Sequence, residues 1–262
     1  MLECVINVSE GRDHDVLDRL AGAAGDDLLD VHTDPDHHRS VFTLVGEHAP
    51  RRLTEAAVAA IDLRRHEGVH PRFGAVDVVP FVPLGDATLS DAVRARDDFA
   101  RWAAATLDLP CFLYGPERTL PDVRRRAFRS LVPEFGPPTA HRSAGACAVG
   151  ARGLLVTYNL WLATPDLGLA KAVAAEVRSG PIRTLGLAVG DEVMVSCNLV
   201  EPLAVGPAGT WDAVAAHTPV ARAELVGLVP EAVLTATPRE RWSELDLAAD
   251  RTIEARLAAT GH

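Results

Sequence analysis

What the sequence lacks limits the classes of protein to which it can belong. Lysine is almost absent, with Lys171 alone among 26 basic residues, and 36 acidic residues give a net charge of -10. Because nucleic-acid-binding proteins carry a basic face, this balance argues against nucleic acid as a partner. No apolar run reaches the length of a membrane span, and no basic stretch followed by an apolar run opens the chain. We therefore expect a cytoplasmic protein without a membrane partner.

Cysteine is also scarce, and the four that occur are isolated. Cys4, Cys111, Cys147 and Cys197 lie in apolar, strand-like contexts, and no two of them form a Cys-x-x-Cys pair. A zinc ribbon or a redox motif is therefore unsupported. Buried, reduced thiols are the simplest expectation.

Hydrophobic periodicity predicts the same order of elements twice: strand, helix, strand, strand, helix, strand. The first round spans residues 2–84 and the second spans residues 153–230, where its second helix is expected at 210–223. Further elements are expected between 89 and 130 and in a helical tail from 238 to 259. This order is the split βαβ unit. We predict an α+β fold of two ferredoxin-like halves, each an antiparallel sheet with helices on one face.

A stretch rich in glycine and proline, residues 133–145, is the natural junction between the halves. We expect an N-terminal subdomain at 1–145 and a C-terminal subdomain with the helical tail at 146–262. A cleft between two such halves is a common place for a ligand, so the site is expected there.

Three histidines and two aspartates lie within the eight residues HTDPDHHR, which run from His32 to Arg39. Imidazole and carboxylate groups are ligand types that suit Zn²⁺. However, their spacing matches no helical or finger pattern, and Pro35 favours a turn. An Asp-Pro turn between two strands, with Asx-type hydrogen bonds, is therefore the favoured interpretation, and a metal site is the alternative.

A second polar group, RRHEGVHPRFG, contains His66 and His70. These histidines would share a face of a helix, but Gly68 and Pro71 interrupt one, so we expect a loop that enters a strand. A histidine pKa near neutrality suits the passing of a proton in both directions. The guanidinium of Arg72 can present a planar fork to a carboxylate. The loop therefore offers a general acid/base beside a carboxylate ligand.

The turn NVSEGRD, residues 7–13, follows the first predicted strand. Asp13 can cap the helix that comes next. Taken alone, the segment is a well-capped connection between strand and helix. With a ligand bound, it offers exposed amides and the carboxylate of Glu10.

Eight segments between Leu2 and Pro230 carry a family resemblance. In chain order they are LECVINVSEGRD, LLDVHTDPDHHRSVFTLVG, HEGVHPRFGAVDVVPFVPL, PCFLYG, PEFGP, GARGLLVTYNLWL, VMVSCNLVE and ELVGLVP. Together they resemble the glutamate formimidoyltransferase family, over its transferase region only. The block HPRFGAVD, residues 70–77, is the strongest part of the resemblance.

The resemblance implies transfer of a formimidoyl or formyl group to N5 of tetrahydrofolate, which is a co-substrate. The implied donor is N-formimidoyl-L-glutamate or a related formimidoyl compound. His70 corresponds to the histidine of the family that acts as general acid/base and relays the N5 proton. The resemblance also implies a folate channel between two ferredoxin-like halves, a homodimer, and a role in one-carbon metabolism and histidine degradation.

Further site residues follow from the matched segments, and no metal ligand is among them. The expected substrate-binding residues are Arg39, Arg72, Glu10, His32, His38, Asn159 and Asn198. The expected folate-binding residues are Gly136, Pro137, His141, Arg142 and Gly145, of which His141 and Arg142 are not residues of the family.

The chain departs from the family at several of these positions. His32 stands where the family usually has a second aspartate, residues 38–40 read His-Arg-Ser in place of Asn-Arg-Thr, and Val69 replaces a glutamate. The segment before Pro133 is also shorter than usual. An aspartate beside the catalytic histidine would orient it and favour its cation. We therefore expect the histidine loop to be functional, with altered chemistry.

Two other functions stay open. One is a metal-dependent hydrolase or lyase on the same scaffold, with His32, His37 or His38 and His70 as ligands. The other is a non-catalytic relative that binds folate or a partner. All three functions share the expected fold, so the fold cannot decide between them.

Overall fold

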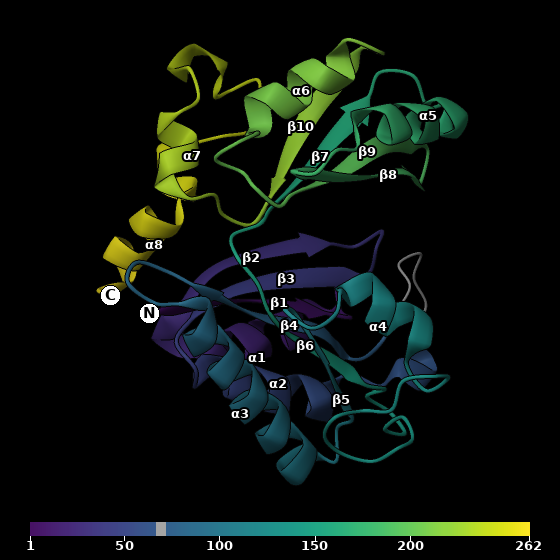
Figure 1. Cartoon of the computed structure of the whole chain (residues 1–262), viewed down its shortest axis with the longest axis vertical. Coiled ribbons are helices and arrows are strands. Elements are labelled where there is room, and N and C mark those ends of the chain that lie inside the picture. The colour runs from purple at the N-terminus through teal and green to yellow at the C-terminus, as the bar shows by residue number, and fades with distance from the viewer. Residues whose placement is uncertain (67–71) are drawn as a thin grey trace. The chain divides into compact units, whose positions relative to one another are not determined.

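The computed structural model describes residues 1–66 and 72–262, and Figure 1 traces them in chain order. The chain divides into two compact units, Met1–Gly153 and Leu154–His262. The boundary lies after residue 153 rather than at residue 145. The reason is that the strand Cys147–Ala151 pairs with two strands of the first unit.

The first unit opens with the expected order of strand, helix, strand, strand, helix and strand. The side chain of Asp13 accepts the N–H of Val16 at 3.1 Å and so caps the first helix, as the sequence predicted. A capping box of Thr88 and Asp91 starts the longest helix. The elements are β1 (Leu2–Val8), α1 (His14–Ala24), β2 (Leu28–Asp34), β3 (Arg39–Val45), α2 (Ala49–Ala60), β4 (Val76–Pro83), α3 (Leu89–Leu107), β5 (Cys111–Tyr114), α4 (Leu120–Arg126) and β6 (Cys147–Ala151).

The sheet of the first unit has the strand order β2-β3-β1-β4-β6-β5. Its first four strands pair antiparallel, as predicted. The prediction of a purely antiparallel sheet is wrong at the other edge, because β6 runs parallel to both β4 and β5. The helices α3, between β4 and β5, and α4, between β5 and β6, explain this: each helical crossover brings the chain back to the same end of the sheet, so the next strand runs in the same direction.

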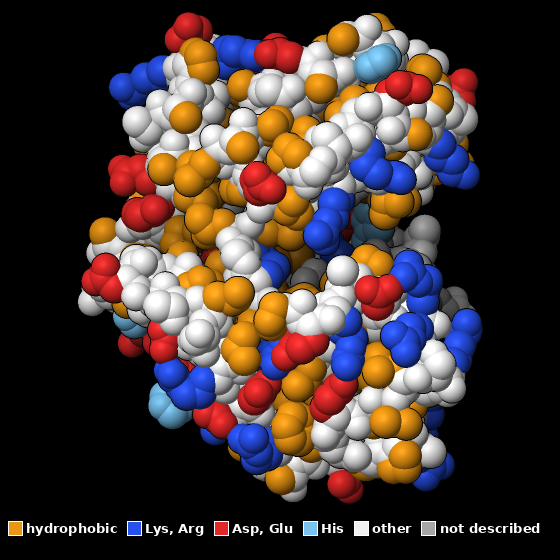
Figure 2. All heavy atoms as spheres, in the orientation of Figure 1, with side chains coloured by type: hydrophobic (Ala, Val, Ile, Leu, Met, Phe, Trp, Pro, Cys, Tyr) orange, Lys and Arg blue, Asp and Glu red, His pale blue; other side chains and the backbone are white. Residues whose placement is uncertain are grey.

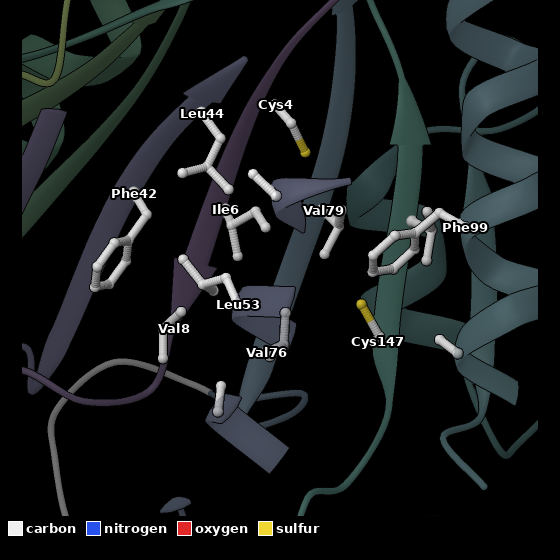
Figure 3. Packing of buried hydrophobic residues seen from close by; sticks show 14 of the residues in the cluster. Cys4, Ile6, Val8, Phe42, Leu44, Leu53, Val76, Val79, Phe99 and Cys147 are labelled. Atoms are coloured by element: carbon white, nitrogen blue, oxygen red, sulfur yellow. The ribbon is translucent and has the colours of Figure 1, made fainter. Parts of the chain in front are cut away.

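One face of this sheet carries the main core of the unit. Successive side chains of a strand point to opposite faces, and Ile6 and Val8 of β1 share a buried cluster with Leu53 of α2, Phe99 of α3 and Cys147 of β6 (Figure 3). The helices α1, α2 and α3 lie together on this side in Figure 1. Burial of apolar side chains between sheet and helices is what stabilises this layer.

The opposite face is covered by α4 at the end where the parallel strands lie. Val123 of α4 belongs to a second buried cluster with Val78, Phe112 and Ala148. The prediction that the helices occupy one face only is therefore wrong for the first unit. Parallel strands bury both faces, so the two added strands need cover on the second side as well.

The second unit repeats the order and is antiparallel throughout, with strand order β10-β7-β9-β8. The predicted helix at 210–223 is too long, because α6 ends at Ala215 and residues 220–226 form a strand. Pro219 accounts for the difference, since a proline disfavours helical backbone in the residue before it. The elements are β7 (Val156–Leu162), α5 (Leu167–Val177), β8 (Ile182–Val189), β9 (Glu192–Leu199), α6 (Pro207–Ala215), β10 (Val220–Val226), α7 (Glu231–Thr235) and α8 (Ile253–Thr260).

The core of the second unit lies on one face of its sheet. Tyr158 and Leu160 of β7 pack there with Val173 of α5 and Val214 of α6. The C-terminal tail joins the same cluster through Leu245, whose carbonyl accepts the hydroxyl of Tyr158 at 3.0 Å. The tail is thus an integral part of this unit.

The α+β class and the state of the cysteines are confirmed. All four cysteines are free and buried, and burial raises the pKa of each thiol. Within the described ranges, none of the helices combines the length and the apolar character needed to cross a membrane. On the face shown in Figure 2, basic and acidic side chains are interspersed.

Candidate active site

The turn after β1 is organised by one carboxylate. Oε1 of Glu10 accepts the backbone N–H groups of Gly11 and Arg12 at 2.8 Å each and that of Asp13 at 3.0 Å. Burial alone would favour the neutral acid, but these N–H groups and the ring of His38 outweigh it and lower the pKa of Glu10. The turn therefore holds an ionised, buried carboxylate in a fixed position.

The histidine loop between β2 and β3 is a turn built on Asp34. Its Oδ1 accepts the N–H groups of Asp36 at 2.9 Å and His37 at 2.8 Å, and its Oδ2 contacts Nδ1 of His37. Burial opposes ionisation here too, but the contacts with His37 prevail and lower the pKa of Asp34 to about 2. The interpretation as an Asx-type turn is confirmed.

The two turns are joined directly. Nε of Arg12 donates to the carbonyl of Pro35 at 2.8 Å, and Oγ of Ser40 donates to the carbonyl of Glu10 at 2.7 Å. A Cβ on Gly11 would lie 2.4 Å from the carbonyl oxygen of Asp34. Glycine is therefore required where the two backbones meet, and the segments NVSEGRD and HTDPDHHR form one structure.

His38 and His66 complete the cluster. Nε2 of His38 lies 2.9 Å from Oε1 of Glu10, and its ring stacks on that of His66 with 3.8 Å between centroids and 15° between planes. Nη1 of Arg72 donates to Nδ1 of His66. Burial, followed by the nearby His38 and Arg72, lowers the pKa of His66 to about 4. The ring of His66 is therefore neutral near pH 7.

This low pKa predicts a stability difference under mild acid. Between pH 4.5 and 6.5, the unfolded chain protonates His66 at its ordinary pKa near 6.5, whereas the folded protein keeps it neutral. The unfolded state binds more protons there, so the free energy of unfolding should rise with pH across this window. In the variant His66→Phe, the increase in the free energy of unfolding between pH 4.5 and 6.5 should be smaller by about 1 kcal/mol, after allowance for solvent screening. Urea unfolding at pH 4.5 and 6.5 checks this, and an unchanged rise would contradict it.

The other residues predicted near this cluster are placed as follows. His32 lies on β2 in register with Val41 of β3, on the side of the sheet away from the main core. Arg39 begins β3 and lies opposite Asp34 in the register of β2 and β3. His70 lies outside the described residues, which resume at Arg72.

The metal alternative names among its ligands His70, which lies outside the described residues. Among the residues that the structure describes, no three histidine, cysteine, aspartate or glutamate side chains are grouped so as to hold a metal ion. His37 contacts Asp34 whereas His38 contacts Glu10, so the two neighbouring rings serve separate carboxylates.

The predicted folate segment is held by close backbone contacts at both ends. Gly136 has a φ of +91°, and a Cβ there would lie 2.9 Å from the carbonyl oxygen of Leu109. Gly145 has a φ of +71°, and a Cβ there would lie 2.6 Å from the carbonyl oxygen of Phe73. Both glycines are explained by backbone packing, since a side chain would be strained at either position.

Between these glycines, His141 stabilises its own loop. Its Nδ1 accepts the N–H of Ala144 at 3.0 Å, and its backbone exchanges two hydrogen bonds with Gly145. This Nδ1 is an acceptor, so the ring proton lies on Nε2. Arg142 is exposed and Pro137 is half-buried. The structure thus shows a local role for His141 and does not test the predicted folate contacts.

In the second unit, the two predicted asparagines lie on adjacent strands. Oε2 of Glu224 accepts Nδ2 of Asn159 at 3.2 Å and Nε1 of Trp161 at 2.9 Å. Oδ1 of Asn198 accepts the hydroxyl of Thr157 at 3.1 Å. Both asparagines lie on the face of this sheet opposite its main core, since the intervening residues of β7 point into the core. The glutamate and the tryptophan were not predicted.

An ion pair between Asp77 and Arg124 was not predicted from the sequence. Asp77 is buried, accepts the N–H of Phe73 at 2.6 Å and contacts Nη2 of Arg124. Arg124 belongs to an arginine run that reads as a solvated helix face. The capping box formed by Thr119 and Asp122 fixes the start of α4 and was the available signal.

Comparison with known proteins identifies the family. Residues 1–152 match the family described as Formiminotransferase domain, N-terminal subdomain. The glutamate formimidoyltransferase of Thermoplasma acidophilum is 34% identical over 89% of each chain. That of Streptococcus pyogenes serotype M1 is 35% identical over 76% of this chain and 77% of its own. The formimidoyltransferase-cyclodeaminase of Gallus gallus is 34% identical over 88% of this chain and 50% of its own.

The matched residues include the whole of the cluster around Glu10, His38 and His66. The relatives that cover most of this chain are named as transferases. The chain belongs to the glutamate formimidoyltransferase family, a family of transferases.

Proposed function

We propose that the protein transfers a formimidoyl group from N-formimidoyl-L-glutamate, or a closely related donor, to N5 of tetrahydrofolate. His70 is the proposed general acid/base. Arg39 and Arg72 are the proposed ligands of donor carboxylates, since a guanidinium matches a carboxylate with two parallel hydrogen bonds. Two relatives that are similar over most of the chain bear the name of this activity.

The observation that carries the proposal is the joining of three separate segments around Glu10. The turn after β1, the loop between β2 and β3 and the residues on either side of 67–71 all contribute side chains to one cluster. The cluster combines an ionised carboxylate, stacked imidazole rings and the guanidinium of Arg72. Such a set of groups suits proton transfer beside an anionic substrate.

The chemistry requires one proton to change places. N5 of tetrahydrofolate attacks the amidine carbon of the donor, and a tetrahedral adduct forms. The bond from that carbon to the glutamate nitrogen then breaks, and the proton lost from N5 ends on the departing nitrogen. A histidine whose pKa lies near neutrality can accept the first proton and deliver it to the second atom.

The proposal includes finer features that the family resemblance implies. Each unit is a ferredoxin-like half, which the β-α-β-β-α-β order and the antiparallel pairing of its four repeat strands support. The segment from Gly136 to Gly145, with Pro137, His141 and Arg142, contributes to folate binding. Glu10, His32, His38, Asn159 and Asn198 are substrate-binding residues. The enzyme is a cytoplasmic homodimer that acts in one-carbon metabolism and histidine degradation.

A calorimetric titration with 5-formyltetrahydrofolate tests the folate half of the proposal. This compound is a stable analogue of the product, because it carries a one-carbon group on N5. We expect saturable binding of about one molecule per chain, the stoichiometry of a single site. Absence of binding to a folded protein would contradict the proposal. N-formimidoyl-L-glutamate, titrated into the same sample, tests the donor half.

A further inference from the structure

Arg72 is held by an unusual partner for an arginine. Its Nη1 donates to Nδ1 of His66, which must therefore carry a lone pair rather than a proton. A neutral imidazole fixes the direction of the guanidinium without bringing a negative charge to it. A carboxylate in the place of this ring would compete with an anionic substrate for the guanidinium of Arg72. This contact thus fixes the direction of the guanidinium of Arg72.

His66 is itself fixed by a chain of contacts that ends in rigid backbone. Its ring stacks on His38 at 3.8 Å between centroids, and Nε2 of His38 lies 2.9 Å from Glu10. Three backbone N–H groups of the turn after β1 hold that carboxylate. The position of Arg72 is therefore linked to β1 through two stacked rings and one carboxylate.

We propose that His66 is a positioning residue that directs Arg72 at a carboxylate of the one-carbon donor, so that the site selects donors carrying this group. This inference rests on the proposed function and assigns to His66 a role separate from that of His70. His66 is not proposed to move a proton, because its Nδ1 accepts from Arg72 and burial lowers the pKa of its ring.

Two substitutions of His66 separate positioning from packing. His66→Asn keeps an acceptor near the place of Nδ1 and gives up the ring. His66→Phe keeps a stacking ring and gives up the acceptor. If orientation of Arg72 is the role, His66→Phe should raise KM for N-formimidoyl-L-glutamate about tenfold to a hundredfold, the usual effect of losing a hydrogen-bonded charge contact. The values of kcat and of KM for tetrahydrofolate should stay within about threefold, and His66→Asn should recover most of the loss.

Donor analogues then identify the carboxylate. N-formimidoyl-L-glutamine and N-formimidoyl-L-isoglutamine each replace one of the two carboxylates of the donor by an amide. The wild-type protein should discriminate against the analogue that lacks the group bound by Arg72. With that analogue, His66→Phe should have no further effect, because the interaction is already lost. Arg64→Ala is the matched control, since Arg64 is exposed and pairs with Asp62.

The outcomes distinguish this inference from the proposed reaction. If His66→Phe turns over with an unchanged KM for N-formimidoyl-L-glutamate, the proposed reaction stands and the inference is overturned. The inference is also overturned if this KM rises equally in His66→Phe and His66→Asn. Calorimetric binding of N-formimidoyl-L-glutamate that is weakened in His66→Phe, without any turnover by the wild type, rejects the reaction and keeps the inference. Absence of both donor binding and turnover in the folded wild type rejects both.

Discussion

Replacing His70 by alanine is expected to lower kcat for formimidoyl transfer by about 10²–10⁴, the usual scale for loss of a general acid/base. The reaction moves a proton from N5 of the folate to the nitrogen of the departing glutamate. Without a group that carries it, this proton must pass through water. The free energy of unfolding should change little. Steady-state kinetics with both substrates saturating, together with urea unfolding, measures the two effects separately.

The exposed His217 provides the control for this experiment. His217→Ala lies in the second unit, on the turn after α6, and should leave kcat unchanged. Equal rates for wild type and His70→Ala would remove His70 from the mechanism. A loss of activity that comes with a loss of folded protein would show a structural role instead.

Replacing Gly11 by alanine is expected to be the most damaging small substitution in the candidate site. The added Cβ would lie 2.4 Å from the carbonyl oxygen of Asp34 and 2.6 Å from the backbone nitrogen of Arg39. Both contacts are with backbone, so no side chain can rotate to relieve them. We expect a loss of about 3 kcal/mol in the free energy of unfolding, together with displacement of the histidine loop and a fall in activity. Urea unfolding and steady-state kinetics measure these effects.

Gly22→Ala is the matched control, because Gly22 lies within α1 and a Cβ there would meet no atom within 4 Å. Alanine is the better helix former by about 0.5–1 kcal/mol, so this variant should be slightly more stable than the wild type. If Gly11→Ala proves as stable as Gly22→Ala, the close approach of the two turns is not a requirement of the fold.

The secondary structure could be predicted wherever local signals were present. The side chain of Asp13 marks the start of α1, and alternating apolar residues mark β1 and β7. Glycine at residue 11 was visible as part of a turn, but its close approach to Asp34 was not. That contact joins residues far apart in sequence and exists only because β1 pairs with β3.

The arrangement of β5, β6 and α4 could not be predicted for the same reason. The directions of β5 and β6 depend on the crossovers through α3 and α4, and the position of α4 depends on the face that β5 and β6 leave uncovered. The contact of Arg124 with Asp77 likewise depends on where α4 packs on the sheet. A single sequence contains no local signal for such pairings, because they arise from packing between distant segments.

The candidate site was predicted as separate clusters, and the resemblance to a family put them in one place. Glu10, His38 and His66 each stood out as polar residues in a turn. The sheet register that brings them together is a tertiary feature. The stack of His38 on His66 could not be predicted, since the family usually has asparagine at residue 38. This substitution introduces a ring where the family has an amide, with a backbone φ of +49° that suits asparagine better.

The most direct test of the central claim is to follow the transferred carbon itself. The purified protein is incubated with tetrahydrofolate and with N-formimidoyl-L-glutamate that carries a ¹³C label in the formimidoyl carbon. Nuclear magnetic resonance and mass spectrometry then locate the label. We predict that it moves to N5 of tetrahydrofolate while one glutamate is released for each label transferred. Label found in formamide or N-formyl-L-glutamate at the same rate with and without tetrahydrofolate would show hydrolysis and contradict the account.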